Sequence, residues 1–194
     1  MKYTKKDFRM ISWDEYGSTL ELLNKKLARL LKKENLSVDT VVPIFRGGSF
    51  PATFLAYKLR ILNIQPVQFK YVVNNGALQL IKLSTPKSNA HARVVLVVEN
   101  NQCFGNTAQR VAKEVRKKFP NATVIYAAAY MDYSHQHVSG ADYSVYGVLT
   151  NETGTLSNDD AVARHIDCRL GLFPWESMEE ELSIINGKEY KYFI

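Results

Sequence analysis

The sequence has 194 residues, 46% hydrophobic and 23% charged, which is the composition of an ordinary globular protein of one domain rather than of a disordered chain. No apolar run approaches the roughly 18 residues of a membrane helix, and the basic N-terminus lacks the apolar core of a secretory signal. The net charge of +6 favours anionic partners such as phosphates and nucleotides, and we expect a cytoplasmic protein that makes no membrane contact and keeps its two cysteines reduced.

Segments with helical spacing of apolar residues alternate with strand-like apolar runs along the chain. Helices are expected to begin at Ser18 and end near Glu34, and to cover residues 51–62, 107–119 and 178–185. Strands are expected at residues 40–45, in a hairpin at 66–83 that turns at residues 74–76, and at 94–98, 122–130, 143–149 and 170–175. Residues 151–166 have the composition of a loop with a short helix. The alternation predicts an α/β fold with a mostly parallel sheet flanked by helices.

Two polar loops directly follow predicted strands, Arg46-Gly47-Gly48-Ser49 and residues 99–107. Ligands of parallel sheets bind outside the carboxyl ends of the strands, so we expect both loops at the same edge of the sheet. The two glycines of the first loop allow close approach of the backbone to a ligand, and Arg46 offers a planar cationic fork. This combination suits a pyrophosphate group.

The loop at residues 99–107 has the features of a sugar-phosphate site. Gly105 allows close approach, and the backbone N–H groups of Asn106 and Thr107 open the next helix, where phosphate binds well. Glu99 and Asn100 can accept hydrogen bonds from sugar hydroxyls. Taken alone, the stretch fits a plain strand-to-helix turn equally well, but the first loop on the same edge favours a phosphate site.

With both loops in place, the sequence resembles the type I phosphoribosyltransferases. Residues 42–52 are similar to the pyrophosphate loop of that family, and residues 95–107 are similar to its signature for phosphoribosyl pyrophosphate (PRPP). Phe173-Pro174-Trp175-Glu176 resembles a closing motif of the xanthine/hypoxanthine/guanine branch. The resemblance implies one phosphoribosyltransferase-like domain over residues 1–194. Its N-terminal segment and residues 150–194 would form a small hood over the nucleobase.

The resemblance also implies a reaction, in which a nucleobase takes 5-phosphoribosyl from PRPP and pyrophosphate leaves. Mg²⁺ would assist, with Glu99 and Asn100 as candidate ligands, and a flexible loop within residues 70–92 would close over the site. A homodimer is implied, whereas a nucleic-acid partner is not expected, because no aromatic residues accompany the basic run at 116–118. The residues that would bind PRPP are Arg46, Gly47, Gly48, Glu99, Asn100, Phe104, Gly105, Asn106 and Thr107.

Several positions depart from the pattern of the family. Asn100 stands where the family has a second acid, Cys103 where purine enzymes have an acid that assists the base, and Phe104 where a threonine is usual. A thiol replaces a carboxylate poorly at neutral pH unless its pKa is lowered, as the adjacent helix N-terminus could do. Glu99 and Cys103 are therefore the candidate catalytic residues.

The expected nucleobase pocket departs from the family as well. Met131 stands where the family has a lysine, Leu170 where it has a stacking aromatic residue, and Trp175 belongs to the closing motif. Residues 151–166 are longer than the usual connection. Two hypotheses follow: an enzyme with an unusual nucleobase acceptor, which we favour, or a catalytically impaired relative that binds PRPP or a nucleotide as a sensor or regulator.

Overall fold

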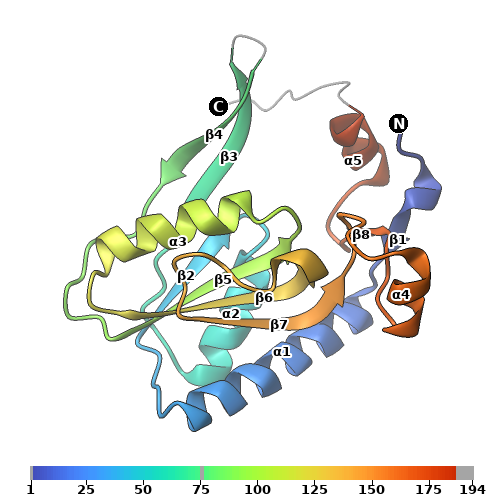
Figure 1. Ribbon diagram of the computed structural model, residues 1–194. Coiled ribbons are helices and arrows are strands. Elements are labelled where there is room, and N and C mark those ends of the chain that lie inside the picture. The colour runs from blue at the N-terminus through green and yellow to red at the C-terminus, as the bar shows by residue number, and fades with distance from the viewer. Residues whose placement is uncertain (1, 75–76, 187–194) are drawn as a thin grey trace.

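The predicted alternation of strands and helices builds a six-stranded sheet in the computed structural model, which describes residues 2–74 and 77–186 (Figure 1). The sheet order is β4-β3-β2-β5-β6-β7, and every neighbouring pair is parallel except the hairpin β3–β4. The strands are β2 (Thr40–Phe45), β3 (Val67–Asn74), β4 (Ala77–Ser84), β5 (Val94–Gln102), β6 (Thr123–Asp132) and β7 (Tyr143–Thr150). This is the expected α/β architecture with a mostly parallel sheet.

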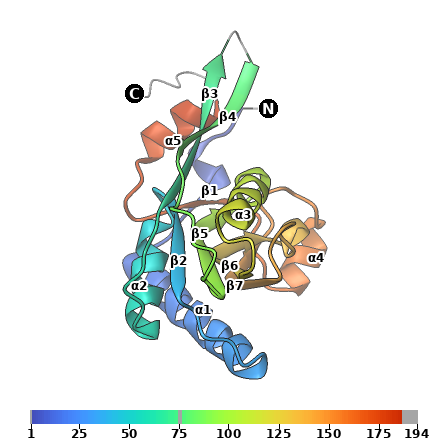
Figure 2. The same ribbon diagram turned by 90° about the vertical axis from the view of Figure 1, so that its left-hand side faces the viewer.

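Helices cover both faces of this sheet (Figure 2). Helices α1 (Trp13–Lys33) and α2 (Ser49–Leu59) pack on one face, and α3 (Asn106–Lys118) packs on the other. The apolar run of β5 serves both faces, because Val95 and Val97 point to the α3 side while Leu96 and Val98 point to the α1 and α2 side. A strand buried on both faces has to be apolar at consecutive positions, which explains the sequence pattern.

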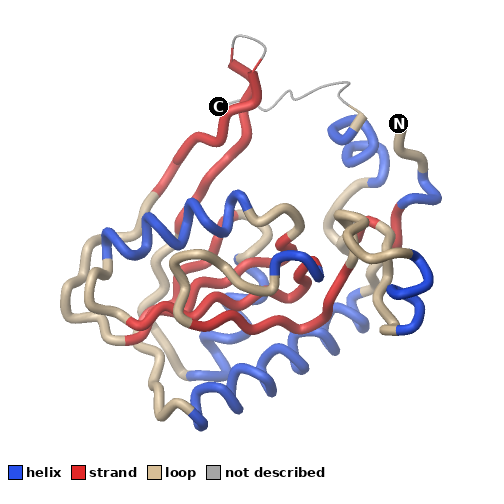
Figure 3. The backbone as a smooth tube through the Cα atoms, in the orientation of Figure 1, coloured by secondary structure: helices blue, strands red, loops and turns tan. Residues whose placement is uncertain are grey.

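A second, small sheet joins segments that are far apart in the sequence. It consists of β1 (Phe8–Met10) and β8 (Leu170–Leu172), which pair in parallel. The Ile11 N–H extends the pairing by donating to the carbonyl of Leu172 at 2.9 Å. The remaining short elements are the 3₁₀ helices η1 (Lys5–Asp7) and η2 (Tyr133–His135) and the helices α4 (Asn158–Ala163) and α5 (Met178–Ile185), shown with the others in Figure 3.

Two helix boundaries differ from the sequence prediction by three or more residues. Helix α1 begins at Trp13 rather than at Ser18, because the Ser12 side chain caps it by accepting the Glu15 N–H at 3.1 Å. The capping pattern at Ser18 lies inside the helix. Helix α2 ends at Leu59 rather than at residue 62, because Arg60 adopts the left-handed conformation that stops a helix.

Strand β5 is longer than predicted, and this changes the second loop. Residues 99–102 do not belong to a loop but continue β5 in parallel register with β6, as the pairs Glu99–Ala128 and Gln102–Met131 show. Strand β6 likewise runs two residues beyond the expected 122–130, to Asp132. The turn that leads into α3 is therefore only residues 103–105.

The hairpin β3–β4 extends beyond the body of the sheet (Figure 1). Its predicted turn at residues 74–76 falls mostly outside the described residues. At its base, Lys82 Nζ and Thr85 Oγ1 each lie 2.9 Å from Glu114 Oε1 of α3. The lysine lowers the pKa of Glu114, so this carboxylate ties β4 to the helix. Among the helices of the described residues, none is long and apolar enough to cross a membrane.

Candidate functional site

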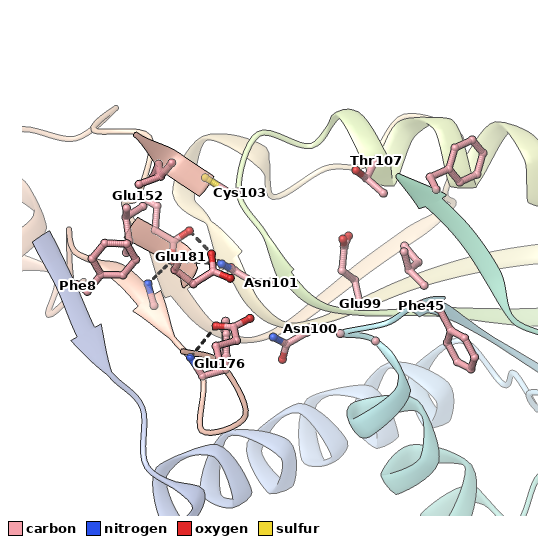
Figure 4. Close-up of a pocket in the computed structure, with 18 residues that line it drawn as sticks. Phe8, Phe45, Glu99, Asn100, Asn101, Cys103, Thr107, Glu152, Glu176 and Glu181 are labelled. Carbon is pink, nitrogen blue, oxygen red and sulfur yellow. Dashed lines mark hydrogen bonds between the residues drawn. The ribbon is translucent and has the colours of Figure 1, made fainter. Parts of the chain in front are cut away.

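A cavity of about 410 Å³ opens between the carboxyl ends of β2 and β5 and the small sheet (Figure 4). We call its wall at the ends of β2 and β5 the loop side, and its wall formed by β8, Glu152 and the segment from Phe173 to Ile185 the small-sheet side. Several residues expected from the sequence line this cavity, namely Gly47, Gly48, Glu99, Asn100, Cys103, Thr107 and Leu170.

The two predicted loops meet on the loop side, because β2 and β5 are adjacent parallel strands. Gly48 packs so closely that a Cβ atom there would lie 2.4 Å from the carbonyl oxygen of Val98 and 2.6 Å from that of Ile44. A Cβ at Gly47 would lie 3.2 Å from Cβ of Asn100. The glycines therefore bring the first loop against the second, and both stand at one edge of the sheet as expected. Arg46 is exposed, and the Phe45–Arg46 peptide bond is cis.

The turn at residues 103–105 leads directly into α3 and borders a second cavity of about 180 Å³. Gly105 has φ of 72°, and a Cβ there would lie 2.9 Å from Cδ2 of His135, so only glycine fits. Asn106 and Thr107 begin the helix, and both line this cavity with the exposed Phe104. The free N–H groups of a helix N-terminus make this turn suited to an anion.

Glu99 stands where the two cavities meet and lines both of them. Its carboxylate accepts a hydrogen bond from the hydroxyl of Tyr126 on β6. Burial raises the pKa of Glu99 to about 7, and the Tyr126 hydrogen bond opposes this rise only in part. The carboxyl group can therefore exist in either protonation state near neutral pH.

Asn100 is buried, and its side-chain oxygen accepts a hydrogen bond of 2.8 Å from the Tyr16 hydroxyl of α1. Burial raises the pKa of Tyr16 far above its ordinary value, so the hydroxyl remains a donor. Nothing in the sequence marked Tyr16 as part of the site, because its contact with Asn100 joins residues 84 positions apart.

Cys103 keeps its proton in this environment. Burial raises the pKa of its thiol, and Glu152 and Asp132 raise it further. The idea that the helix N-terminus activates this thiol is therefore wrong, because desolvation and two neighbouring carboxylates outweigh the helix. Cys103 and Glu152 line the same cavity.

Three carboxylates on the small-sheet side were missed by the sequence reasoning as site residues: Glu152, Glu176 and Glu181. Burial raises the pKa of Glu176 to about 7, and its Oε2 accepts the Phe173 N–H at 2.9 Å. Burial also raises the pKa of Glu181. Arg46 lies near enough to oppose both rises, so this side of the cavity and the first loop interact electrostatically. Only Glu176, in the closing motif, carried a sequence signal.

Of the three residues expected in the nucleobase pocket, Leu170, Met131 and Trp175, only Leu170 lines the cavity. Leu170 lines the cavity at the start of β8. Met131 does not, because β6 continues past it and its side chain is fully buried in the core against α3. Trp175 stacks on Phe50, with ring centroids 4.4 Å apart, and on Phe173, with centroids 5.4 Å apart. Trp175 thus supports the cavity wall from behind. The described residues include no cluster of three or more His, Cys, Asp or Glu side chains that could hold a metal ion alone.

No protein-family model matches the sequence. Solved structures do share its fold. A purine phosphoribosyltransferase from Pyrococcus horikoshii aligns with a TM-score of 0.64 and 20% identity over 89% of this chain and 95% of that one. For the xanthine-guanine-hypoxanthine phosphoribosyltransferase of Helicobacter pylori, the TM-score is 0.63 at 17% identity, over 91% and 99% of the two chains.

A third solved structure, a hypothetical protein from Neisseria gonorrhoeae with bound ppGpp, aligns with a TM-score of 0.62 and 19% identity over 92% of this chain and 96% of that one. At these identities the likeness concerns the fold. The chain has the type I phosphoribosyltransferase fold, as the two sequence loops indicated.

Proposed function

We propose that the protein transfers 5-phosphoribosyl from PRPP to a nucleobase and releases pyrophosphate. The observation that carries this proposal is that two glycine loops border adjoining cavities, both of which are lined by Glu99. The first loop, Arg46-Gly47-Gly48, follows β2, and the second leads into α3 at Gly105. A ligand with two separate phosphate groups joined by a sugar would use both loops at once.

The proposed placement of PRPP follows from the chemistry of each wall. The 5′-phosphate would lie at the turn before α3, where the N–H groups of Asn106 and Thr107 are available. The pyrophosphate would lie at the first loop beside Arg46. Glu99 and Asn100, between the two loops, would accept hydrogen bonds from the ribose hydroxyls.

The reaction is a substitution at C1 of the ribose. A ring nitrogen of the nucleobase forms a bond to C1, and the bond from C1 to the pyrophosphate oxygen breaks, with its electron pair leaving on pyrophosphate. Holding both reactants in one partly enclosed cavity supplies much of the rate enhancement, because positioning replaces a bimolecular encounter. The Glu99 carboxylate lies where positive charge on the ribose would develop and would stabilise it.

Mg²⁺ fits this arrangement as a partner of PRPP. Mg²⁺ is usually held by one or two carboxylates together with phosphate oxygens of the substrate rather than by an all-protein cluster. Glu99 offers one such carboxylate, and Asn100, whose side-chain oxygen also accepts from Tyr16, lines the same cavity. When bound, the ion would neutralise charge on the diphosphate and help it leave.

We also propose that the small-sheet side acts as the hood over the nucleobase. Phe8 of β1, Leu170 of β8 and Phe173 line the cavity opposite the loop side. These apolar side chains come from both ends of the described chain, and they give a flat base a surface to lie against.

A second candidate function is binding of PRPP or a nucleotide without catalysis. It is favoured by the protonated thiol of Cys103 where an acid would assist the base, and by the engagement of the Asn100 oxygen with Tyr16. The Neisseria gonorrhoeae protein of the same fold, with ppGpp bound, supports the idea that this fold can hold a guanine nucleotide.

Two measurements separate these functions. The protein is incubated with PRPP, Mg²⁺ and each of a panel of purines and pyrimidines, and pyrophosphate release is followed. Turnover with at least one base is expected. No turnover with any base, together with calorimetric binding of PRPP or a nucleotide, would favour the regulator. Absence of both turnover and binding would refute both functions.

A further inference from the structure

Opposite Cys103, the structure places a carboxylate that comes from another part of the chain. Glu152 belongs to the connection between β7 and α4, within residues 151–166. It lines the same cavity as Cys103 (Figure 4), and its charge helps to raise the pKa of the Cys103 thiol. The turn before α3 lacks the expected acid at Cys103, but a carboxylate from another segment lines the same cavity.

The Glu152 carboxylate is held by donors from two strands. Asn101 of β5 donates its side-chain N–H group to both oxygens, at 3.0 and 3.3 Å. The backbone N–H of Gly171 in β8 donates to Oε1 at 3.0 Å. A carboxylate offers about four acceptor positions, so it retains capacity for a further donor from the cavity. Burial raises the pKa of Glu152, which moves this group toward the range where it exchanges a proton readily.

The backbone on both sides of Glu152 is fixed as well. Asn151 is buried, and its side chain exchanges two hydrogen bonds with the backbone of Leu156, at 2.9 and 3.0 Å. Thr153 donates its backbone N–H and its hydroxyl to the buried carboxylate of Asp132, at 2.9 and 2.8 Å. A simple surface connection would not need two buried polar anchors on either side of an acid that lines the cavity.

We propose that Glu152 is the acid that serves the nucleobase in this protein, replacing the one that Cys103 does not supply. This inference rests on the proposed transferase function. As the ring nitrogen bonds to C1 and pyrophosphate leaves with the electron pair of the broken bond, the N–H proton of the base passes to the Glu152 carboxylate. Glu152 ends the step as a neutral carboxylic acid and returns the proton to solvent after product release.

The variant Glu152→Gln tests this role because it keeps the shape of the side chain and an oxygen acceptor for Gly171. With the base that the wild-type protein uses, we expect kcat to fall by about 10²- to 10⁴-fold, the range for a lost general base. The affinity for PRPP should stay within about twofold, since Glu152 lies on the small-sheet side. Asp159→Asn is the matched control, because Asp159 is an exposed acid at the start of α4 in the same connection, and its kcat should be unchanged.

A rescue experiment separates this role from a structural one. In the Glu152→Gln background, Cys103→Asp returns an acid to the same cavity, and we expect at least a tenfold recovery of kcat. A merely structural Glu152 would give no such recovery. In the wild-type background, Cys103→Asp should lower kcat, because it adds a second charge beside Glu152 and Asp132.

The outcomes are distinguishable. Wild-type turnover with an unchanged kcat for Glu152→Gln overturns the inference and leaves the proposed function intact. A large gain of activity from Cys103→Asp alone also overturns it, since the native cavity would then lack an acid. No wild-type turnover with any base removes the proposed function and the inference with it.

Discussion

On the loop side of the cavity, glycines fix the backbone, whereas the small-sheet side carries carboxylates from separate segments. Gly48 and Gly105 cannot carry a Cβ atom, and each stands directly before a helix. Glu152, Glu176 and Glu181 line the small-sheet side, and the hydrogen bonds of Glu152 with Asn101 and Gly171 join separate segments of the chain. The loops on the loop side can therefore adopt only one backbone conformation. On the small-sheet side, substitution of side chains can change the chemistry of the cavity wall while the backbone stays the same.

The largest effect is expected from Gly48→Ala. A Cβ atom at 2.4 Å from the Val98 carbonyl meets backbone, which cannot rotate away, so the loop must shift from β5. We expect a loss of about 1–3 kcal/mol in the free energy of unfolding and a loss of PRPP binding of more than tenfold. Thermal unfolding and calorimetry measure the two effects.

Gly17→Ala provides the control for that substitution. Gly17 lies in α1 with no heavy atom within 4 Å of a built Cβ, and alanine in a helix interior is more favourable than glycine by about 0.5–1 kcal/mol. This variant should be slightly more stable and bind PRPP like the wild type. Equal behaviour of the two variants would contradict the view that the loop side has a single permitted backbone.

The same contrast explains what could be predicted from the sequence. The loops after β2 and β5 were found because apolar runs, glycines and helix starts are local signals, and parallel strands bring their carboxyl ends to one edge. The pairing of β5 with β6 was not local, so the continuation of β5 through Glu99 and Gln102 was missed. The burial of Met131 follows from that same continuation and was missed for the same reason.

The small-sheet side could hardly be predicted at all. Its position depends on the pairing of β1 with β8, two three-residue strands at opposite ends of the described chain with no periodic pattern of their own. Glu152 and Cys103, which line the same cavity, are far apart in the sequence, and neither residue alone indicates the other. Only the excess length of the connection after β7 hinted at an additional role.

An intermediate effect is expected from pH on the free energy of unfolding, which can be compared for one acid from each side of the cavity, Glu99 and Glu176. Burial raises the pKa of both Glu99 and Glu176 from 4.5 to about 7, so the folded protein holds protons there that the unfolded chain has lost. The free energy of unfolding contributed by these groups therefore falls as pH rises from about 4.5 to about 7. The glutamine variants do not lose this free energy of unfolding as pH rises. Between about pH 5 and pH 8, the free energy of unfolding of Glu99→Gln and of Glu176→Gln should therefore each rise relative to that of wild type by on the order of 1–3 kcal/mol.

Urea unfolding of the three proteins at both pH values measures this change, and the wild type corrects for all other titrating groups. Similar gains would mean that the two sides desolvate their acids equally. A rise in the free energy of unfolding, relative to wild type, for only one variant would show that only the acid on that side is desolvated. Parallel profiles for all three proteins would contradict a raised pKa at either position.

The smallest effect is expected from Leu170→Trp on the small-sheet side. Leu170 lines the cavity from the start of β8, and an aromatic ring there would add a stacking surface for a flat base. Such a contact contributes about 0.5–1.5 kcal/mol, which lowers KM for the base by about two- to tenfold. Leu62→Trp, at a leucine with 97% of its surface exposed, is the control and should leave KM unchanged. Because the loop side is fixed by backbone, the affinity for PRPP should not change, and a loss of PRPP binding would show that the two sides are coupled through the cavity.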